Sequence, residues 1–249
     1  MSITPMIYLD GRGVTRDEVL RVAQQAATGF EQLGVSEGDT VALLLRNDFA
    51  FFEVQQAAAA VGAYGVAGAI CVRIDDRRAA YEMTRDLIAE GHRRLGFILG
   101  NPDQAASAER LAGFYAAVRE ADDVQTTIAQ GDFSFTSGLA AAELLLDASP
   151  APTAIFASND DMAAAVVSVA HRRHLDVPGA LTVAGFDDTA AAVTLWPPLT
   201  TVRQPVRELA AEALGLLAAQ ISGAETHLAD RRDRVLDHQV VRRLSTSPP

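Results

Sequence analysis

The stretch PTAIFASNDDMA, residues 152–163, decides the fold because its pattern changes at one point. TAIFA is a short, continuous apolar run, which is typical of a buried strand in a parallel sheet. The polar residues SNDD follow at once, and after them the apolar residues recur at helical spacing. The sequence therefore predicts a strand over 153–157 that leads directly into a helix over 160–173.

The same alternation continues on both sides and is typical of an α/β fold with doubly wound parallel sheets and right-handed crossovers. The expected strands cover 41–45, 66–74, 95–99, 125–129, 181–186, 199–203 and 235–243, and the expected helices cover 49–61, 77–90, 107–119, 137–147 and 205–222. Before them, a hairpin over 7–14 turns at Asp10-Gly11, and a helix starts with a capping box from Thr15 to Glu18. The last residues, STSPP, are expected to form a frayed tail.

The charge composition excludes several classes of function. The formal net charge of the 249 residues is -11, whereas non-specific binding to nucleic acid or to an anionic membrane needs a positive surface. All 21 basic residues are arginine, and the sequence contains no lysine. Mechanisms that need a lysine amine, such as Schiff-base formation or lysine-assisted phosphate transfer, are therefore excluded.

Cysteine content and hydropathy indicate the compartment. The single cysteine, Cys71, lies in an apolar stretch and implies no disulfide framework. No apolar run approaches the roughly 18 residues that a membrane span needs, and the N-terminal MSITPMIYLDGRG has no secretory pattern. We therefore expect a cytoplasmic protein with no membrane partner.

Polar side chains gather beyond the carboxyl ends of the expected strands, which is where ligands bind in open parallel sheets. Asn159 and Asp187 each follow a strand, Phe133 lies in the loop after another, and Arg110 lies on a nearby helix. Amide, carboxylate, guanidinium and aromatic groups together can hold a polyhydroxylated or heterocyclic small molecule. Position alone supports equally well a second role for Asn159, as the N-cap of the helix that follows it.

The motifs from Val72 to the C-terminus resemble those of a known family. Their order matches the effector-binding core of LacI/GalR-family transcriptional regulators: VRIDDRRAAYEMTRDLIAEGHRRLGFILG, ERLAGF, GDFSFTSG, PTAIFASNDDMA, VPGALTVAGFDD and PPLTTVRQP. The resemblance implies a periplasmic-binding-protein-like type I fold whose two lobes clamp a sugar or related metabolite. It also implies that Arg110 binds ligand hydroxyls, that Phe133 stacks on the ligand, and that Asn159 and Asp187 hydrogen-bond to it.

Residues 7–66 do not match that family and resemble a different one. A short hairpin, a helix, LGVSEGDTVALLLRN and a second helix that ends in a Gly-Ala pair are similar to the N-terminal edge of adenylate-forming acyl-CoA synthetases. The resemblance stops before that family's phosphate loop and catalytic lysine, so no adenylating activity is expected. Residues 1–71 are expected to form part of a reduced, rebuilt first lobe, with 199–222 packing on it, and 72–249 form the effector-binding region.

Three functions are compatible with these features. The first is the small-molecule sensor domain of a LacI/GalR-type regulator that lacks its helix-turn-helix headpiece, with a sugar or purine-like effector, no direct DNA binding and at most a weak homodimer. The second is a recombined or engineered chimera of two α/β fragments, because the resemblance changes abruptly at 66–72. The third is an acyl-CoA synthetase remnant.

No catalytic residue, cofactor or metal site is predicted, and we do not expect an enzyme. The strongest metal candidates, His171 and His174, have no evident third ligand. We expect both histidines to lie on the surface of a helix C-terminus, where a cation is favoured by the helix dipole.

Overall fold

The computed structural model describes residues 6–9, 12–32, 34, 36, 40–41, 57, 60, 64–65, 71–221 and 233–249. The chain forms two compact units. The first contains Met1–Cys71 and Glu212–Asp233, and the second contains Val72–Ala211 and Arg234–Pro249. The second unit carries every residue that the sequence places at a ligand site.

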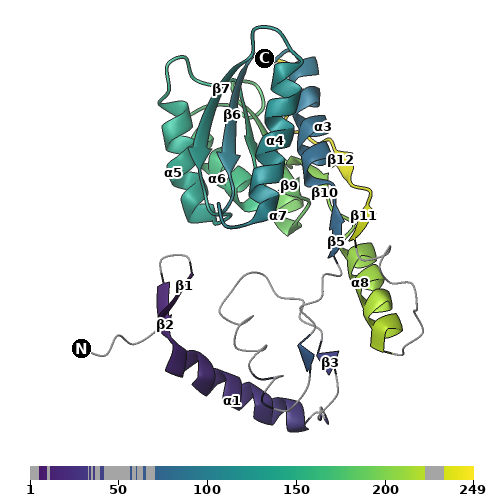
Figure 1. Cartoon of the computed structure of the whole chain (residues 1–249). Coiled ribbons are helices and arrows are strands. Elements are labelled where there is room, and N and C mark those ends of the chain that lie inside the picture. Colours follow the sequence, from purple (N-terminus) through teal and green to yellow (C-terminus); the bar gives the residue numbers. More distant parts are fainter. Residues whose placement is uncertain are drawn as a thin grey trace. The chain divides into compact units, whose positions relative to one another are not determined.

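A six-stranded sheet forms the centre of the second unit (Figure 1). Its strands pair in a parallel manner except for the edge strand β12, which runs antiparallel to β10. In order across the sheet these are β12 (Gln239–Val241), β10 (Thr200–Arg203), β9 (Thr182–Asp187), β8 (Ala154–Ala157), β6 (Arg94–Leu99) and β7 (Gln125–Gln130). The predicted α/β fold with a mostly parallel sheet is confirmed.

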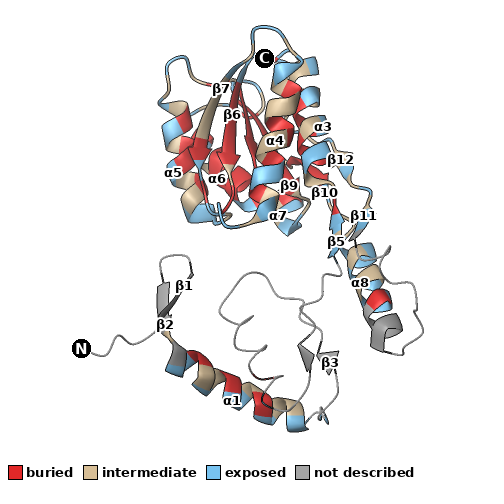
Figure 2. Cartoon of the chain, viewed as in Figure 1, coloured by how far each residue is buried: buried red, intermediate tan, exposed pale blue. Residues whose placement is uncertain are grey.

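Helices cover both faces of this sheet, and the buried residues of Figure 2 concentrate beneath them. Successive strand residues point to opposite faces, so Phe97 and Phe156 pack with one helical layer, whereas Ile98 and Ile155 pack with the other. The first layer is α3 (Asp76–Ala89) and α4 (Ala105–Arg119), and the second is α5 (Phe135–Leu146) and α6 (Asp160–Arg172). The predicted strand-to-helix step at 152–163 is therefore present as β8 followed by α6.

Close packing between α3 and α4 depends on one glycine. A Cβ atom at Gly113 would lie 2.1 Å from the backbone oxygen of Arg77 and 2.9 Å from the backbone nitrogen of Tyr81. Backbone atoms of a packed helix cannot move aside as a flexible side chain can. We predict that Gly113→Ala lowers the free energy of unfolding by about 3 kcal/mol, as overpacked cores do.

Chemical denaturation followed by circular dichroism measures this loss. Gly215→Ala is the matched control, because Gly215 also lies in a helix, α8 (Val206–Ile221), and a Cβ atom there meets no atom of the described residues within 4 Å. The control should stabilise the helix by roughly 0.5–1 kcal/mol. Equal denaturation midpoints for the two variants would show that α3 can shift away from α4.

The expected single closing strand over 235–243 is wrong. The chain instead forms β11 (Asp233–Leu236), which pairs with β5 (Cys71–Ile74), and then β12 in the large sheet. Asp237 and His238 separate the two strands because both are held by α3: Asp237 pairs with Arg78 at 2.6 Å and His238 contacts Glu82 at 2.8 Å. An apolar pattern cannot reveal such a break, which depends on polar partners far away in the sequence.

One further expectation near the C-terminus is corrected, and the range 199–222 divides between the two units. The expected frayed tail is fixed: Ser245 is buried, and its hydroxyl donates to the oxygen of Val183 and accepts from the backbone nitrogen of Thr200. Within 199–222, strand β10 lies between β9 and β12 in the second unit, whereas Glu212–Ile221 belong to the first unit. A short helix that the sequence analysis missed, α7 (Ala190–Thr194), follows β9.

The described part of the first unit begins with a hairpin of β1 (Met6–Leu9) and β2 (Arg12–Thr15). Helix α1 (Arg16–Gln32) follows, and the backbone nitrogen of Glu18 donates to the Thr15 hydroxyl at 3.2 Å, as the capping box predicts. Strand β3 (Thr40–Val41) pairs in parallel with β4 (Tyr64–Gly65). The predicted turn at Asp10-Gly11 and most of the predicted elements over 41–45, 49–61 and 66–70 lie outside the described residues.

Candidate functional site

Arg110 is the centre of the candidate site. It projects from α4 and is only 6% exposed. Its guanidinium carbon lies 3.6 Å from the ring centroid of Phe186, and its Nε donates to Asp76 Oδ1 at 2.8 Å. Its Nη1 donates to the backbone oxygen of Ser158, the residue that directly follows β8. These contacts hold the guanidinium in one position beyond the carboxyl ends of the strands, so a ligand that binds there meets a preorganised cation.

Asp187, at the end of β9, brings a second carboxylate to Arg110. Its Oδ1 lies 3.9 Å from Arg110 Nη2 and accepts a hydrogen bond from Gln204 Nε2 at 2.6 Å. Asp187 and Asp188 both have positive φ angles, of 109° and 57°. Non-glycine residues in this region are strained, and such strain persists only where neighbouring contacts fix the backbone.

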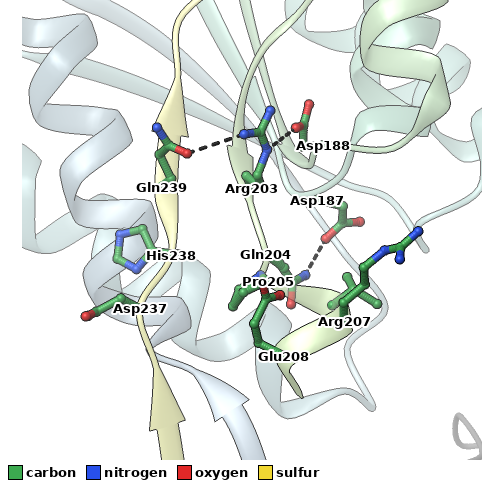
Figure 3. A pocket seen from close by; sticks show the side chains of 11 residues that line it. Asp187, Asp188, Arg203, Gln204, Pro205, Arg207, Glu208, Asp237, His238 and Gln239 are labelled. Carbon is green, nitrogen blue, oxygen red and sulfur yellow. Dashed lines mark hydrogen bonds and ion pairs between the residues drawn. The ribbon is translucent and has the colours of Figure 1, made fainter. Parts of the chain in front are cut away.

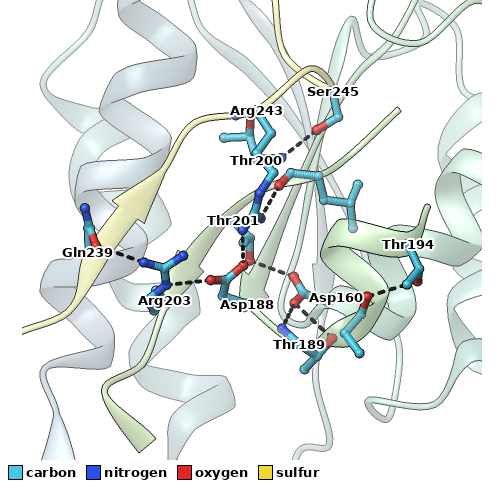
Figure 4. A network of polar contacts seen from close by, with 12 residues as sticks. Asp160, Asp188, Thr189, Thr194, Thr200, Thr201, Arg203, Gln239, Arg243 and Ser245 are labelled. Carbon is cyan, nitrogen blue, oxygen red and sulfur yellow. Dashed lines mark hydrogen bonds and ion pairs between the residues drawn. The ribbon is translucent and has the colours of Figure 1, made fainter. Parts of the chain in front are cut away.

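The contacts of Asp188 supply that restraint (Figure 4). Its carboxylate pairs with Arg203 at 2.6 Å and with Arg243 at 2.5 Å, and its side chain is 8% exposed. Burial acts to raise the pKa of Asp188, but the hydrogen bonds from the two arginines outweigh it and hold the pKa below its ordinary value. The network therefore fixes the loop that presents Asp187.

Asn159 acts as an N-cap in this structure. Its Oδ1 accepts from the backbone nitrogen of Met162 at 2.9 Å, and its Nδ2 donates to the backbone oxygen of Phe133 at 2.8 Å. Position in the sequence left open whether Asn159 binds a ligand or caps the helix, and the capping role is present. The amide also joins the start of α6 to the loop that carries Phe133, so it positions part of the site whichever ligand binds.

Phe133 borders the site with its ring. Its φ of 75° is positive, and its ring centroid lies 5.8 Å from the guanidinium carbon of Arg110. A Cβ atom at Gly100 would meet the Phe133 ring at 2.0 Å, so glycine is needed there for the ring to lie in this position. Arg110, Phe133, Asn159 and Asp187 thus lie around one place, and together with Asp76 we call them the Arg110 cluster.

A second layer of the site contains the buried carboxylate of Asp160 (Figure 4). It accepts from the Thr201 hydroxyl at 2.6 Å and from the backbone nitrogen of Thr189 at 2.7 Å. Burial, with a smaller contribution from the nearby charge of Asp187, raises the pKa of Asp160 to about 6, against the opposing effect of the hydrogen bonds from Thr201 and Thr189. Asp160 therefore links the start of β10 to the loop after Asp187.

A pocket of about 470 Å³ lies next to Asp187 (Figure 3), within the size range of small-molecule sites. Of the four residues predicted from the sequence, Asp187 alone lines it, whereas the Phe133 ring lies beside Arg110 and Asn159 is hydrogen-bonded to the backbone of Phe133. Asp187 therefore belongs to both regions. The complete lining is Asp187, Asp188, Arg203, Gln204, Pro205, Val206, Arg207, Glu208, Asp237, His238 and Gln239.

Three site residues were missed by sequence reasoning: Asp76, Phe186 and Gln204. Asp76 looks like an ordinary acid in the first turn of a helix, and Phe186 looks like a core residue of a strand. Gln204 follows directly after β10, so the rule that placed Asp187 at the end of β9 could have identified it. The contacts of Arg110 with Asp76 and Phe186 could not be identified, because both residues lie on elements distant from it in sequence.

The described residues provide no group of three or more potential metal ligands, and His171 and His174 are both exposed. Within that same described part of the chain, no helix is both long enough and apolar enough to cross a membrane.

Comparison with known proteins gives consistent matches. Residues 84–246 match the family model of the periplasmic binding protein-like domain. The transcriptional regulator DegA of Bacillus subtilis is 38% identical over 179 residues, which are 71% of this chain and 52% of DegA. The chain thus spans about half the length of the curated relatives it matches.

Solved structures of transcriptional regulators are also similar. A sugar-binding regulator of the LacI family from Escherichia coli, in complex with phosphate, superposes with a TM-score of 0.69 at 27% identity, covering 91% of this chain and 82% of that one. The regulator CelR in complex with cellobiose gives a TM-score of 0.72 at 29% identity, covering 93% of this chain and 71% of that one. The family match, the similar regulators and the mostly parallel sheet all indicate the same family. The chain belongs to the periplasmic binding protein-like domain family, in the form found in the effector-binding region of LacI/GalR-type transcriptional regulators.

Proposed function

We propose that this chain is the effector-binding module of a LacI/GalR-type transcriptional regulator and that its effector is a sugar or a related small metabolite. Arg110, Phe133, Asn159 and Asp187 contact the effector in this proposal. The module binds rather than catalyses, and it operates in the cytoplasm. Because its net charge is -11, we expect this chain to make no direct contact with DNA.

One observation carries the proposal: Arg110 lies between the carboxylates of Asp76 and Asp187, stacked on Phe186, at the carboxyl ends of the strands. A buried ion pair is a costly way to stabilise a fold, so its presence at the usual ligand edge of such a sheet favours a binding role. The sugar-binding regulator and the cellobiose complex among the similar structures support the same class of ligand.

We also propose that residues 1–71 form part of the first lobe and that residues 72–249 form the effector-binding region. The structural similarity to the two regulators covers 91% and 93% of the chain, whereas residues 72–249 are only 178 of its 249 residues. The similarity therefore extends into residues 1–71, which supports their place in the first lobe. The resemblance of 7–66 to acyl-CoA synthetases stays a prediction. With the first lobe rebuilt, we expect a monomer or a weak homodimer.

Thermal-shift measurements on the full chain with glucose, galactose, ribose, cellobiose, adenosine and ATP test the proposed function. At a hundredfold excess over Kd, a true effector should raise Tm by about 5 °C or more. Asp187→Asn tolerates the positive φ but removes the charge, so the shift should fall by at least half. Asp122→Ala, an exposed acid on a distant turn, should keep the full shift. A shift with ATP alone would contradict the proposal.

A further inference from the structure

Several hydrogen-bond donors of the Arg110 cluster are already directed toward protein acceptors. The side chain of Arg110 is 7% exposed, and its Nε and Nη1 already donate to Asp76 and to the backbone of Ser158. The Nδ2 of Asn159 donates to a backbone oxygen. The 7% exposure of the Arg110 side chain also limits the access of a ligand to its remaining N–H groups on Nη1 and Nη2.

The carboxylates are the more exposed polar groups. The side chains of Asp76 and Asp187 are 17% and 26% exposed, compared with 7% for Arg110. An ionised carboxylate only accepts hydrogen bonds, and its two oxygens offer about four lone-pair positions. The surface that a ligand meets here is thus mainly acceptor surface with negative charge.

The helix N-termini at this edge do not reverse that charge. Helix N-termini normally attract anions through their positive dipole ends and unpaired backbone nitrogens. Here α3 begins with the N-cap Asp75 and with Asp76, and α6 carries Asp160 and Asp161 in its first turn. These acids already compensate both dipoles. In the adjoining pocket, the charges of Arg207 and Glu208 are of opposite sign.

On the basis of the proposed function, we infer that this site selects effectors that donate hydrogen bonds and carry no negative charge, and that Asp76 and Asp187 set this selection. Neutral polyols and amino sugars belong to this class. Sugar phosphates, sugar acids and inorganic phosphate do not, because an anion seated beside Arg110 would also lie beside two carboxylates. Like charges at such distances repel each other even in a partly solvated site.

Isothermal titration calorimetry of the full chain at pH 7 tests this inference with probes that share a ring: glucose, glucosamine and glucose 6-phosphate, and ribose with ribose 5-phosphate. In each series, the phosphorylated probe should bind at least tenfold more weakly than the neutral or amino form. Asp76→Asn keeps an oxygen that accepts from Arg110 Nε and removes one charge. In this variant, the ratio of the Kd of the phosphorylated probe to the Kd of the neutral probe should fall about tenfold.

Asp147→Asn is the matched control, because Asp147 also pairs with an arginine, Arg173 at 2.7 Å, but its side chain, at the C-cap of α5, is 70% exposed. It should leave the discrimination unchanged. Binding of a phosphorylated probe as tightly as its neutral form overturns the inference and leaves the proposed function standing. If no form of any probe binds, the proposed sugar-binding function fails, and the inference fails with it.

Discussion

Arg110→Met is expected to destabilise the second unit by about 3 kcal/mol and to abolish any effector-induced shift in Tm. Methionine keeps most of the apolar contact with Phe186 but leaves Asp76 without its cation. Removal of one partner from a buried pair is costly because the remaining charge stays desolvated. The 17% exposure of the Asp76 side chain places the expected loss at the lower end of the range for such pairs.

The matched control is Arg78→Met, which removes an arginine that also pairs closely with an aspartate, Asp237 at 2.6 Å, but whose side chain is 46% exposed. Exposed pairs contribute little, so the urea midpoint of this variant should be nearly unchanged. Addition of Asp76→Asn to Arg110→Met should recover more than half of the lost stability. No recovery in the double variant would show that the loss comes from packing on Phe186 and not from the ion pair.

Most elements of the second unit could be predicted because they follow a local pattern. The apolar run over 153–157 ends where β8 ends, and the glycine after the helix over 77–90 is Gly91, which has a φ of 109°. What could not be predicted depends on distant partners. The break between β11 and β12 follows from contacts to α3, and the order of the tail follows from the Ser245 hydroxyl.

The same distinction applies to the site. Sequence position placed Arg110, Phe133, Asn159 and Asp187 near the carboxyl ends of the strands, and the structure brings these four together. Sequence position could not show that Arg110 forms an ion pair with Asp76. Nor could it show that the amide of Asn159 caps α6 and hydrogen-bonds to the backbone of Phe133. Their contact with an effector stays a prediction.

Asp160 should give the protein a stability component that decreases as the pH rises. Burial raises the pKa of its carboxyl from 3.8 to about 6 in the folded state, so between these values the folded chain holds a proton that the unfolded chain has lost. Asp160 therefore opposes folding fully above about pH 6, and this cost disappears as the pH falls toward 3.8. A shift of this size corresponds to about 3 kcal/mol.

Asp160→Asn isolates this contribution, because asparagine does not titrate and can fill the same space. Its Oδ1 can accept from the Thr189 nitrogen while its Nδ2 donates to the Thr201 hydroxyl, so the contacts of the carboxylate are preserved in number. The variant should match the native protein near pH 4 and exceed its free energy of unfolding by up to about 3 kcal/mol at pH 7. Subtraction of the two urea-unfolding profiles removes the opposite trend of Asp188, whose pKa is lowered by Arg203 and Arg243 against the effect of burial. A difference that is constant from pH 4 to 7 would mean that Asp160 keeps the same charge in the folded and unfolded chain over that range.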